Sequence, residues 1–365
     1  MTKIGIIGAG QLGQMLGYAA KAIDAECIFL DPNKNSPAKS AGKVLNYAFN
    51  DIEGIKKLSS MVDIITYEFE NVPVEAINTL DTKFVFPGSK ALEIAQDRLK
   101  EKKLFESLGI PVAKYKEINS LSDLKNTSSE IGYPFILKTR HFGYDGKGQI
   151  IINTQADLMD AWSQVEGHQL IAEKMIKFDY EVSAIGARNI SGDTASYSLT
   201  QNSHKQGILR TSITAIDNQK ITEKAYKFHN KLLTNLNYVG VLALELFVVE
   251  GELLANEFAP RVHNSGHWTI EGANSSQFEN HLRAILDLKL GDTSNRGFIG
   301  MENLIGFIPN SLIDLNPNKY FVHDYGKSAR PGRKLGHVTV VADTQEERLQ
   351  RLQKIQAILE DKNIN

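Results

Sequence analysis

Two glutamates inside an apolar hairpin constrain this chain more than any other feature. Residues 240–269 have the sequence GVLALELFVVEGELLANEFAPRVHNSGHWT, which contains Glu245 and Glu257. The apolar stretches 241–248 and 253–259 flank a Glu-Gly turn, so strand, turn and strand are predicted. A carboxylate inside a sheet is costly unless a cation or a hydrogen-bond donor meets it. The two charges therefore need a partner within the fold.

The length of the turn decides whether the two glutamates share a face of the sheet. A two-residue turn at 250–251 would place them on opposite faces. We predict a three-residue turn at 249–251, with a left-handed glycine that closes a bulge, which places Glu245 and Glu257 on one face, diagonal to each other. Two such charges repel by about 4 kcal/mol at an effective dielectric of about 20, so Mg²⁺ between them is favoured. The structural alternative pairs one glutamate with Arg261 and leaves the other solvated on an edge strand.

The composition is that of an ordinary globular protein. The chain has 365 residues, 42% of them apolar, and a formal net charge of -2. This length allows two or three domains, and the near-neutral charge gives no global case for nucleic-acid binding. The single cysteine, Cys27, excludes an intramolecular disulfide and is typical of a reducing compartment. No stretch approaches the roughly 20 apolar residues that span a bilayer, and the run at 4–7 is strand-like rather than a cleavable signal, so we expect a cytoplasmic protein without nucleic-acid or membrane partners.

The N-terminal part alternates short apolar runs with helical patterns, which predicts a parallel α/β domain over 1–99. The strands are expected at residues 3–7, 27–30, 64–66 and 84–86. After the first strand the glycine turn GAGQLG at 8–13 opens a helix, and Asp31 closes the next strand, a spacing that matches the dinucleotide fingerprint. Taken alone it suggests NAD, yet such a turn accepts any phosphate or packs closely against its strand.

A small α+β region is expected over 100–176. A helix at 97–108 and a breaker at 109–111 lead into it, and its own helix is expected at 155–165. Its strands are expected at 134–138, 148–152 and 169–173. Between the first two strands lies HFGYDGKGQ, residues 141–149, whose glycines and lysine suit a mobile loop over a polyphosphate. An exposed hairpin turn with an incidental lysine is the structural alternative.

A larger α+β region that contains the glutamate hairpin is expected over 177–365. Its last helix is predicted at 345–361, where Thr344 and Glu347 form a capping box. The apolar residues of that helix recur at helical spacing and so predict a buried stripe. The stripe consists of Leu349, Leu352, Ile355 and Leu359.

Five features follow one another in a fixed order along the chain. They are the Rossmann-like start, a lysine on a strand of the second region, the basic glycine loop, a strand ending in EKMI, and the two-glutamate hairpin. Together they resemble the ATP-grasp enzymes. Over essentially the full length the chain is similar to the 5-(carboxyamino)imidazole ribonucleotide synthase family. The motifs that carry this resemblance are GAGQLGQM, TYEFENV, QDRLKEK, GYDGKGQ, NEFAPRVHNSGHWTIEG and YGKSARPGRKLGH.

The resemblance implies an ATP-grasp fold with a Rossmann-like N-terminal domain, a small α+β lid and a larger C-terminal α+β domain. The segment from about residue 310 is then expected to bind substrate. The implied reaction is carboxylation of the exocyclic amine of 5-aminoimidazole ribonucleotide with ATP and bicarbonate, through carboxyphosphate, in purine biosynthesis. Mg²⁺ is the implied metal, Glu245 and Glu257 are its implied ligands, and a homodimer is the implied assembly.

The implied ATP site draws on both the lid and the hairpin. Lys138 lies on an otherwise apolar strand, where an ammonium is costly unless an anion meets it, although snorkelling to solvent is common for lysine. At the hinge 173–176, backbone groups of residues 174–176 can bind the adenine edge and Met175 can pack on the adenine face, while Glu181 suits the ribose hydroxyls. A plain strand exit is the structural alternative. The implied ATP-binding residues are Arg98, Lys138, Gly143, Tyr144, Asp145, Gly146, Lys147, Gly148, Gln149, Glu173, Lys174, Met175, Ile176, Glu181, His204, Asn256 and Glu257.

The implied acceptor site combines the carboxyl ends of the first strands with two basic segments. Arginine suits bidentate recognition of the acceptor's phosphate, although a basic run is usually a solvated loop. Asp145 and His263 are candidate polar partners of the acceptor amine and of carboxyphosphate or CO₂. The implied catalytic residues are Asp145, Lys147, Arg261 and His263. The implied substrate contacts are Gln11, Leu12, Glu68, Glu70, Arg261, His263, Asn264, Ser265, Lys327, Arg330 and Arg333, with Lys334 in the same segment.

One position departs from the ATP-grasp pattern. Many of these enzymes have an asparagine two residues after the second glutamate, where this chain has Ala259, and Asn256 would point to the opposite face of a regular strand. Three alternatives stay open: an NAD-dependent dehydrogenase, another ATP-grasp ligase with a different acceptor, and a non-catalytic nucleotide-binding regulator. The order of the motifs argues against the first, RVHNSGHWT and GKSARPGRKLGH against the second, and retention of Lys138 and both glutamates against the third.

Overall fold

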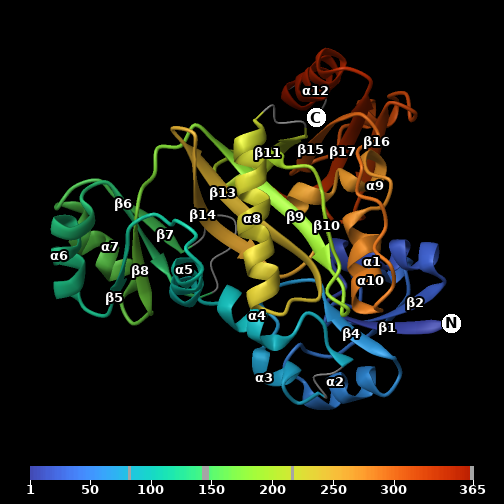
Figure 1. The fold of residues 1–365 in the computed structure, drawn as a ribbon, viewed down its shortest axis with the longest axis horizontal. Coiled ribbons are helices and arrows are strands. Elements are labelled where there is room, and N and C mark those ends of the chain that lie inside the picture. The colour runs from blue at the N-terminus through green and yellow to red at the C-terminus, as the bar shows by residue number, and fades with distance from the viewer. Residues whose placement is uncertain (81–83, 142–147, 215–217, 362–365) are drawn as a thin grey trace.

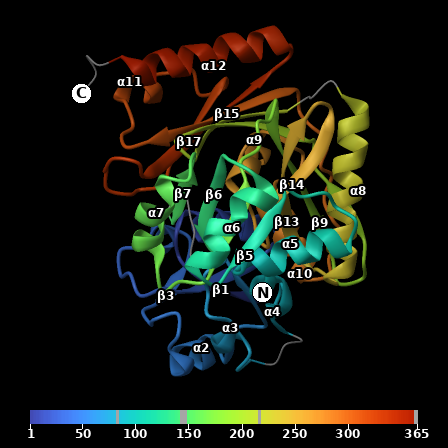
Figure 2. The ribbon, with the colours of Figure 1, turned by 90° about the vertical axis from the view of Figure 1, so that its left-hand side faces the viewer.

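The described residues form three β-sheets, one in each of three consecutive parts of the chain (Figure 1). The computed structural model describes residues 1–80, 84–141, 148–214 and 218–361. The lid, drawn in green, and the N-terminal part, drawn in blue, both adjoin the large central sheet (Figure 1). Figure 2 shows the last helix, α12 (Gln345–Glu360), at the end of the molecule opposite the N-terminal part.

The N-terminal sheet is parallel, as the alternation of strands and helices predicts. Its elements, with the helix that leads to the lid, are β1 (Thr2–Ile7), α1 (Gln11–Ala20), η1 (Lys21–Ile23), β2 (Ala25–Leu30), η2 (Pro37–Ser40), β3 (Lys43–Leu45), α2 (Ile52–Ser59), β4 (Ile64–Tyr67), α3 (Val74–Ile77), α4 (Ser89–Ala95) and α5 (Arg98–Ser107). The strand order is β3-β2-β1-β4. The strand predicted at 84–86 is wrong, because Val85 forms only an isolated bridge with Ile65. Strand β3 was not predicted.

The lid sheet is antiparallel. Its elements are β5 (Tyr115–Ile118), α6 (Leu121–Ile131), β6 (Phe135–Thr139), β7 (Gln149–Ile152), α7 (Asp157–Val165) and β8 (Leu170–Lys174). The strand order is β5-β8-β6-β7, and the three predicted strands and the predicted helix are all present. Helix α6 lies in a polar stretch and was not predicted. Ser120 caps it by accepting a hydrogen bond from the backbone N–H of Asp123 at 3.1 Å.

The central sheet has nine strands within the described residues and is covered by helices on both faces. The elements of its first part are β9 (Tyr180–Arg188), β10 (Thr194–Ser196), β11 (Thr200–Lys205), β12 (Ile208–Ile213), α8 (Gln219–Asn235), β13 (Gly240–Val249), β14 (Glu252–Ala259), η4 (Asn264–Gly266), α9 (Thr269–Gly272) and α10 (Gln277–Ile285). Successive residues of β13 face opposite sides: Leu242 joins the apolar cluster that contains Leu232 of α8, and Ala243 joins the one that contains Leu282 of α10. Glu245 therefore continues the row on the α10 face.

The C-terminal part extends the same sheet. Its elements are β15 (Phe298–Ile305), α11 (Asn310–Ile313), β16 (Tyr320–Asp324), β17 (Lys334–Ala342) and α12. Thr344 caps α12 as predicted, accepting from Glu347 N at 3.1 Å. The predicted stripe is partly wrong: Leu352 and Ile355 are buried, but Leu349 is exposed. The buried row is completed by two arginines, Arg348 and Arg351, whose guanidinium groups donate to the carbonyls of Thr214 and Val341.

Candidate active site

The glutamate hairpin has a shorter turn than predicted. Val249 pairs with Glu252, so only Glu250 and Gly251 join β13 to β14. Both are left-handed, with φ of 50° and 76°. The prediction of a three-residue turn is therefore wrong, although its left-handed glycine is present.

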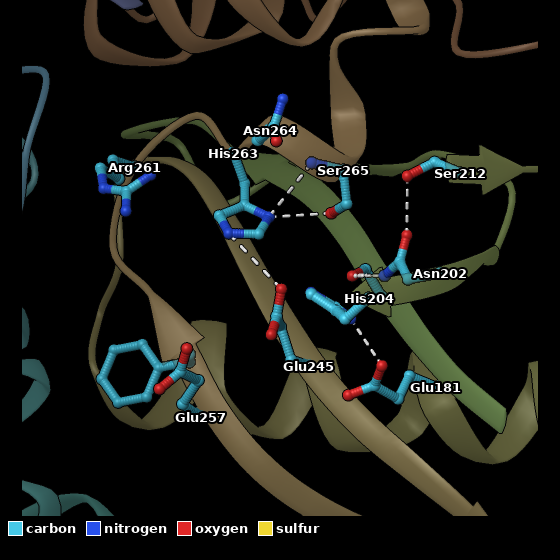
Figure 3. A network of polar contacts seen from close by, with 12 residues as sticks. Glu181, Asn202, His204, Ser212, Glu245, Glu257, Arg261, His263, Asn264 and Ser265 are labelled. Carbon is cyan, nitrogen blue, oxygen red and sulfur yellow. Dashed lines mark hydrogen bonds and ion pairs between the residues drawn. The ribbon is translucent and has the colours of Figure 1, made fainter. Parts of the chain in front are cut away.

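An unpredicted β-bulge nevertheless places both glutamates on one face. Leu246 pairs with Ala255, but Glu245 pairs with Glu257, which leaves Asn256 as an extra residue on β14. The bulge shifts the register by one residue. The glutamates become direct cross-strand partners rather than diagonal neighbours, and Figure 3 shows them on the adjacent strands.

The electrostatics of this pair fit a divalent cation. Burial raises the pKa of Glu245 to about 7, the carboxylate of Glu257 adds to the rise, and His204 opposes it. Arg98 Nη1 lies 3.3 Å from Glu257 Oε2. His263 Nε2 lies 3.5 Å from Glu245 Oε1 (Figure 3). Among the described residues no group of three or more His, Cys, Asp or Glu can hold a metal. Two carboxylates suit Mg²⁺, which completes its shell with phosphate and water oxygens.

A cavity of about 560 Å³ lies in front of the hairpin and reaches from the lid to the N-terminal part. It is lined by many of the residues implicated from the sequence: Gln11, Leu12, Glu68, Glu70, Arg98, Lys138, Gln149, Glu181, His204, Glu245, Asn256, Glu257, Arg261, His263, Asn264 and Lys334. The bulge explains why Asn256 lines it, because the residue no longer follows the alternation of a regular strand. The predicted loop residues Gly143, Tyr144, Asp145, Gly146 and Lys147 lie outside the described residues.

The glycine turn at the start of α1 is filled by a side chain of the protein itself. The carboxylate of Glu68, at the end of β4, accepts from Gly10 N at 2.5 Å and from Gly13 N. A Cβ at Gly8 or Gly10 would lie 2.3 or 2.7 Å from the nearest Glu68 atom, so the glycines make room for this carboxylate. Asp31 accepts from Ala9 N at 2.9 Å. Because a carboxylate occupies the position of a pyrophosphate, the turn gives no support to NAD binding.

On the lid side, a buried ionic cluster surrounds Glu173. Lys138 Nζ lies 3.1 Å from Glu173 Oε1 and Lys102 Nζ lies 3.3 Å from Glu173 Oε2. Burial alone would raise the pKa of Glu173, but the two ammonium groups outweigh it and lower the pKa to about 2. The Glu173 side chain thus belongs to the cluster that holds Lys138 in front of the cavity.

Two backbone N–H groups of the hinge after β8 form hydrogen bonds within the lid. Lys174 N donates to Lys114 O at 2.8 Å, and Met175 N donates to Pro134 O at 3.3 Å. The predicted adenine contact therefore has to use other backbone groups of the hinge. Met175 is 40% exposed, as a side chain that packs on a ligand requires. Neither Glu173, Lys174, Met175 nor Ile176 is among the residues that line the cavity.

Two neighbouring strands carry the predicted ribose contact. Glu181 of β9 lies beside β11, and its Oε2 is 2.5 Å from His204 Nδ1 (Figure 3). Burial alone would lower the pKa of His204, but the hydrogen bond with Glu181 and the charge of Glu245 raise it. Both side chains line the cavity.

At the acceptor end, two basic side chains bind residues that were predicted from the sequence. Arg261 forms an ion pair with Glu70. Burial would raise the pKa of Glu70, but the Arg261 guanidinium outweighs it and lowers the pKa. Lys327 Nζ donates to Gln11 Oε1 at 2.5 Å, although Lys327 itself is not a lining residue. Arg330 is exposed and Arg333 bonds Ser328 of its own loop, so of the basic segment only Lys334 lines the cavity.

His263 is oriented by its neighbours. Its Nδ1 lies 2.8 Å from Ser265 Oγ and accepts from Ser265 N at 3.4 Å (Figure 3). Ser265 is fully buried and does not line the cavity, so its predicted contact with substrate stays a prediction, while its observed contact is with His263. Asn264 lines the cavity and donates to Asn303 Oδ1 at 3.0 Å.

Sequence reasoning missed the two residues that flank the hairpin from α5, Glu101 and Lys102, which are both buried. The spacing of Arg98, Glu101 and Lys102 places three charges on one helical face. That pattern could have indicated from the sequence that this face of the helix contacts the site.

Comparison with known proteins defines the class first. Residues 103–278 match the ATP-grasp domain, residues 1–96 match the ribonucleotide synthetase preATP-grasp domain, and residues 300–351 match the phosphoribosylaminoimidazole carboxylase C-terminal domain. The chain is an ATP-grasp enzyme.

The similar proteins then define the family. An N5-carboxyaminoimidazole ribonucleotide synthase of Pseudomonas aeruginosa is 41% identical over 360 residues, 98% of this chain and 99% of its own. The Bacillus subtilis synthase is 39% identical over 96% of this chain and 94% of its own. The crystal structure of the Thermus thermophilus synthetase superposes with a TM-score of 0.93 at 41% identity, covering 98% of this chain and 99% of that one. The chain belongs to the N5-carboxyaminoimidazole ribonucleotide synthase family and is a ligase.

A further solved structure carries ligands. The Aspergillus clavatus synthase, in complex with ADP and 5-aminoimidazole ribonucleotide, superposes with a TM-score of 0.90 at 30% identity and covers 98% of both chains.

Within the described part of this chain, no helix combines the length and apolar character that a membrane crossing requires.

Proposed function

We propose that the chain carboxylates the exocyclic amine of 5-aminoimidazole ribonucleotide with ATP and bicarbonate and so acts in purine biosynthesis. The observation that carries this proposal is the direct pairing of Glu245 and Glu257 at the wall of one cavity that also contains the candidate acceptor residues. Family membership over nearly the whole chain supports the same reaction. The proposed products are 5-(carboxyamino)imidazole ribonucleotide, ADP and phosphate.

The lid and the hairpin bind the nucleotide in this proposal. Lys138 and Arg98 supply positive charge to the phosphates, while Glu181 and His204 form the wall at the ribose. Glu245 and Glu257 would hold Mg²⁺, which would supply positive charge beside the phosphates. We also assign the loop 143–149 and the hinge 173–176 to ATP binding.

The proposed reaction has two steps, formation of carboxyphosphate and carboxylation of the amine. A bicarbonate oxygen attacks the γ-phosphorus of ATP, and the bond from that phosphorus to the β-phosphate oxygen breaks, giving carboxyphosphate and ADP. The amine nitrogen of the acceptor then bonds to the carbon of carboxyphosphate, directly or after release of CO₂, as phosphate leaves and the amine gives up a proton. Arg261 and His263 lie at the cavity wall, where they can orient the carboxyphosphate. Asp145 is the proposed partner of the amine, and Lys147 is the fourth proposed catalytic residue.

The acceptor's ribose phosphate is assigned to the N-terminal end of the cavity. Gln11, Leu12, Glu68 and Glu70 line this end, and Lys327 reaches it through its bond with Gln11. Lys334 and Asn264 also line the cavity. Arg330 and Arg333 of the same basic segment do not line it, and we assign them to the phosphate only as additional positive charge.

The test of the reaction is a coupled ADP-release assay in which one component is omitted at a time. We expect ADP release to require Mg²⁺, bicarbonate and 5-aminoimidazole ribonucleotide together. ADP release that is indifferent to both bicarbonate and the acceptor would contradict the proposal.

We further propose a cytoplasmic homodimer whose chain divides at 1–99, 100–176 and 177–365. The family supports the dimer, and the single cysteine supports a reducing compartment. Light scattering of the purified protein should give about twice the chain mass of 40.6 kDa. A mass of one chain at micromolar concentration would remove the dimer from the proposal.

A further inference from the structure

Helix α5 binds the outer edge of the strand that carries Glu257. β14 is the terminal strand of the central sheet, so its outward backbone groups need partners from outside the sheet. Lys102 Nζ donates to Asn256 O at 2.7 Å, and Glu101 Oε1 accepts from Phe258 N at 2.7 Å. These are the two outward peptide groups on either side of Glu257. One turn of α5 therefore holds the backbone around this glutamate from both directions.

The Asn256 carbonyl that Lys102 binds belongs to the bulge. Asn256 is the extra residue of β14, and without it Glu257 would not face Glu245. A bulge leaves its extra residue outside the ladder, so a partner for that residue's carbonyl stabilises the bulge directly. Lys102 supplies this partner with a charged donor, which forms a stronger bond than a neutral one.

The same ammonium also contacts the lid. Lys102 Nζ lies 3.3 Å from Glu173 Oε2, while Lys138 Nζ lies 3.1 Å from the other oxygen of that carboxylate. Arg98, one helical turn before Lys102, places Nη1 3.3 Å from Glu257 Oε2. The face of α5 thus touches the Glu257 side chain, the peptide groups that flank it, and the carboxylate that holds Lys138.

An incidental packing role does not account for Lys102. Its side chain is only 3% exposed, so the ammonium does not reach solvent by snorkelling. A buried ammonium is costly unless its partners compensate for lost hydration. Its two observed partners are the bulge carbonyl and Glu173, so both contacts are specific to the junction between hairpin and lid.

We propose that Lys102 is a positioning residue for the metal and nucleotide site: it fixes the bulge that sets Glu257 opposite Glu245, and it ties this bulge to the lid strand. The inference rests on the proposed metal role of the two glutamates. Lys102 itself touches neither substrate nor metal in this scheme. It acts through the position of Glu257 and through Glu173.

The test replaces Lys102 by methionine, which has a similar length but no donor. Lys103→Met is the matched control, because Lys103 is the next residue of the same helix and is exposed. Calorimetric titration with ADP at a series of Mg²⁺ concentrations gives the Mg²⁺ requirement of binding for each variant. We expect Lys102→Met to raise the half-saturating Mg²⁺ concentration about tenfold or more, and Lys103→Met to leave it unchanged. Hydrogen exchange in β14 should also be faster in Lys102→Met than in Lys103→Met.

These measurements distinguish a positioning role of Lys102 from a packing role, and they test the proposed metal site separately. A packing role would change exchange and melting temperature without changing the Mg²⁺ requirement. If Lys102→Met does not fold, Lys102→Gln keeps a shorter neutral donor and is expected to raise the requirement less. The inference is overturned if the variant that folds has the same half-saturating Mg²⁺ concentration as the wild-type protein. Glu257→Gln is measured in parallel: if it keeps Mg²⁺-dependent ADP binding, the proposed metal site itself fails, and if only the Lys102 variants behave like wild type, the inference alone fails.

Discussion

The glutamates of this protein differ in how their negative charge is compensated, because their immediate partners differ. Glu68 is surrounded by backbone N–H donors at the start of α1, and Glu173 lies between two ammonium groups. Glu245 faces another carboxylate, and burial together with that charge raises its pKa to about 7. The carboxylates of Glu68 and Glu173 therefore find their partners within the protein. The pair of Glu245 and Glu257 is the one that a cation would complete.

Substitution of Glu257 tests that distinction. Glu257→Gln keeps the shape of the side chain but removes a metal ligand, so we expect ADP release to fall on the order of 100-fold. The melting temperature should change little, because the substitution also removes the repulsion with Glu245. Glu252→Gln is the matched control on the same strand: Glu252 is exposed and pairs with Lys224 at the surface, and such pairs contribute little. Wild-type-like turnover in Glu257→Gln would refute the metal role.

At the scale of elements, the hairpin shows where sequence patterns stop being informative. The Glu-Gly pair predicted the position of the turn, although not its length, and the apolar runs predicted the strands, because both signals are local. The bulge at Asn256 has no local signal, since it depends on Lys102 and on the pairing of β13 with β14. The same limit explains Leu349: the helix period was right, but two arginines with carbonyl partners replaced a leucine in the buried row.

The turn itself makes a prediction about stability. Two consecutive left-handed residues favour Asn-Gly, so Glu250→Asn should stabilise the protein by about 1 kcal/mol, measured as a higher urea midpoint at unchanged slope. The backbone bond from Glu250 N to Asp179 Oδ2 is unaffected by this change. Gly251→Ala should cost about 1 kcal/mol through backbone strain alone, because an added Cβ would meet nothing within 4 Å. A Glu250→Asn variant that is less stable than wild type would contradict the observed turn.

Across the whole molecule, the sequence predicted three regions and their fold classes but not how distant segments meet. Glu68 fills the glycine turn from another strand, and β12 pairs with β15 across the intervening hairpin. Such contacts are non-local, and periodicity within a short window carries no information about them. The nucleotide-binding fingerprint was misleading for this reason: its glycines make room for the Glu68 carboxylate, which lies 58 residues beyond Gly10 in the chain.

The global stability should depend on pH through Glu101, which clamps β14 from a buried position. Burial raises its pKa from 4.5 to about 8, while Lys102 opposes the rise and Glu257 adds to it. The folded protein therefore keeps a proton that the unfolded chain releases, so this stabilisation is complete below pH 4.5 and is lost as the pH rises through about 8. At about 1.4 kcal/mol per pH unit, the upper limit of the loss is about 5 kcal/mol.

Glu101→Gln isolates this contribution. The amide oxygen still accepts from Phe258 N but does not titrate, so we expect the variant to lose less stability than wild type between pH 5 and pH 9. Urea unfolding at several pH values measures the difference. Glu53→Gln, at an exposed position on α2, should follow the wild-type curve. If the Glu101→Gln curve stays parallel to wild type over this range, then Glu101 carries no extra proton in the folded state, and its bond to Phe258 is that of an ordinary carboxylate.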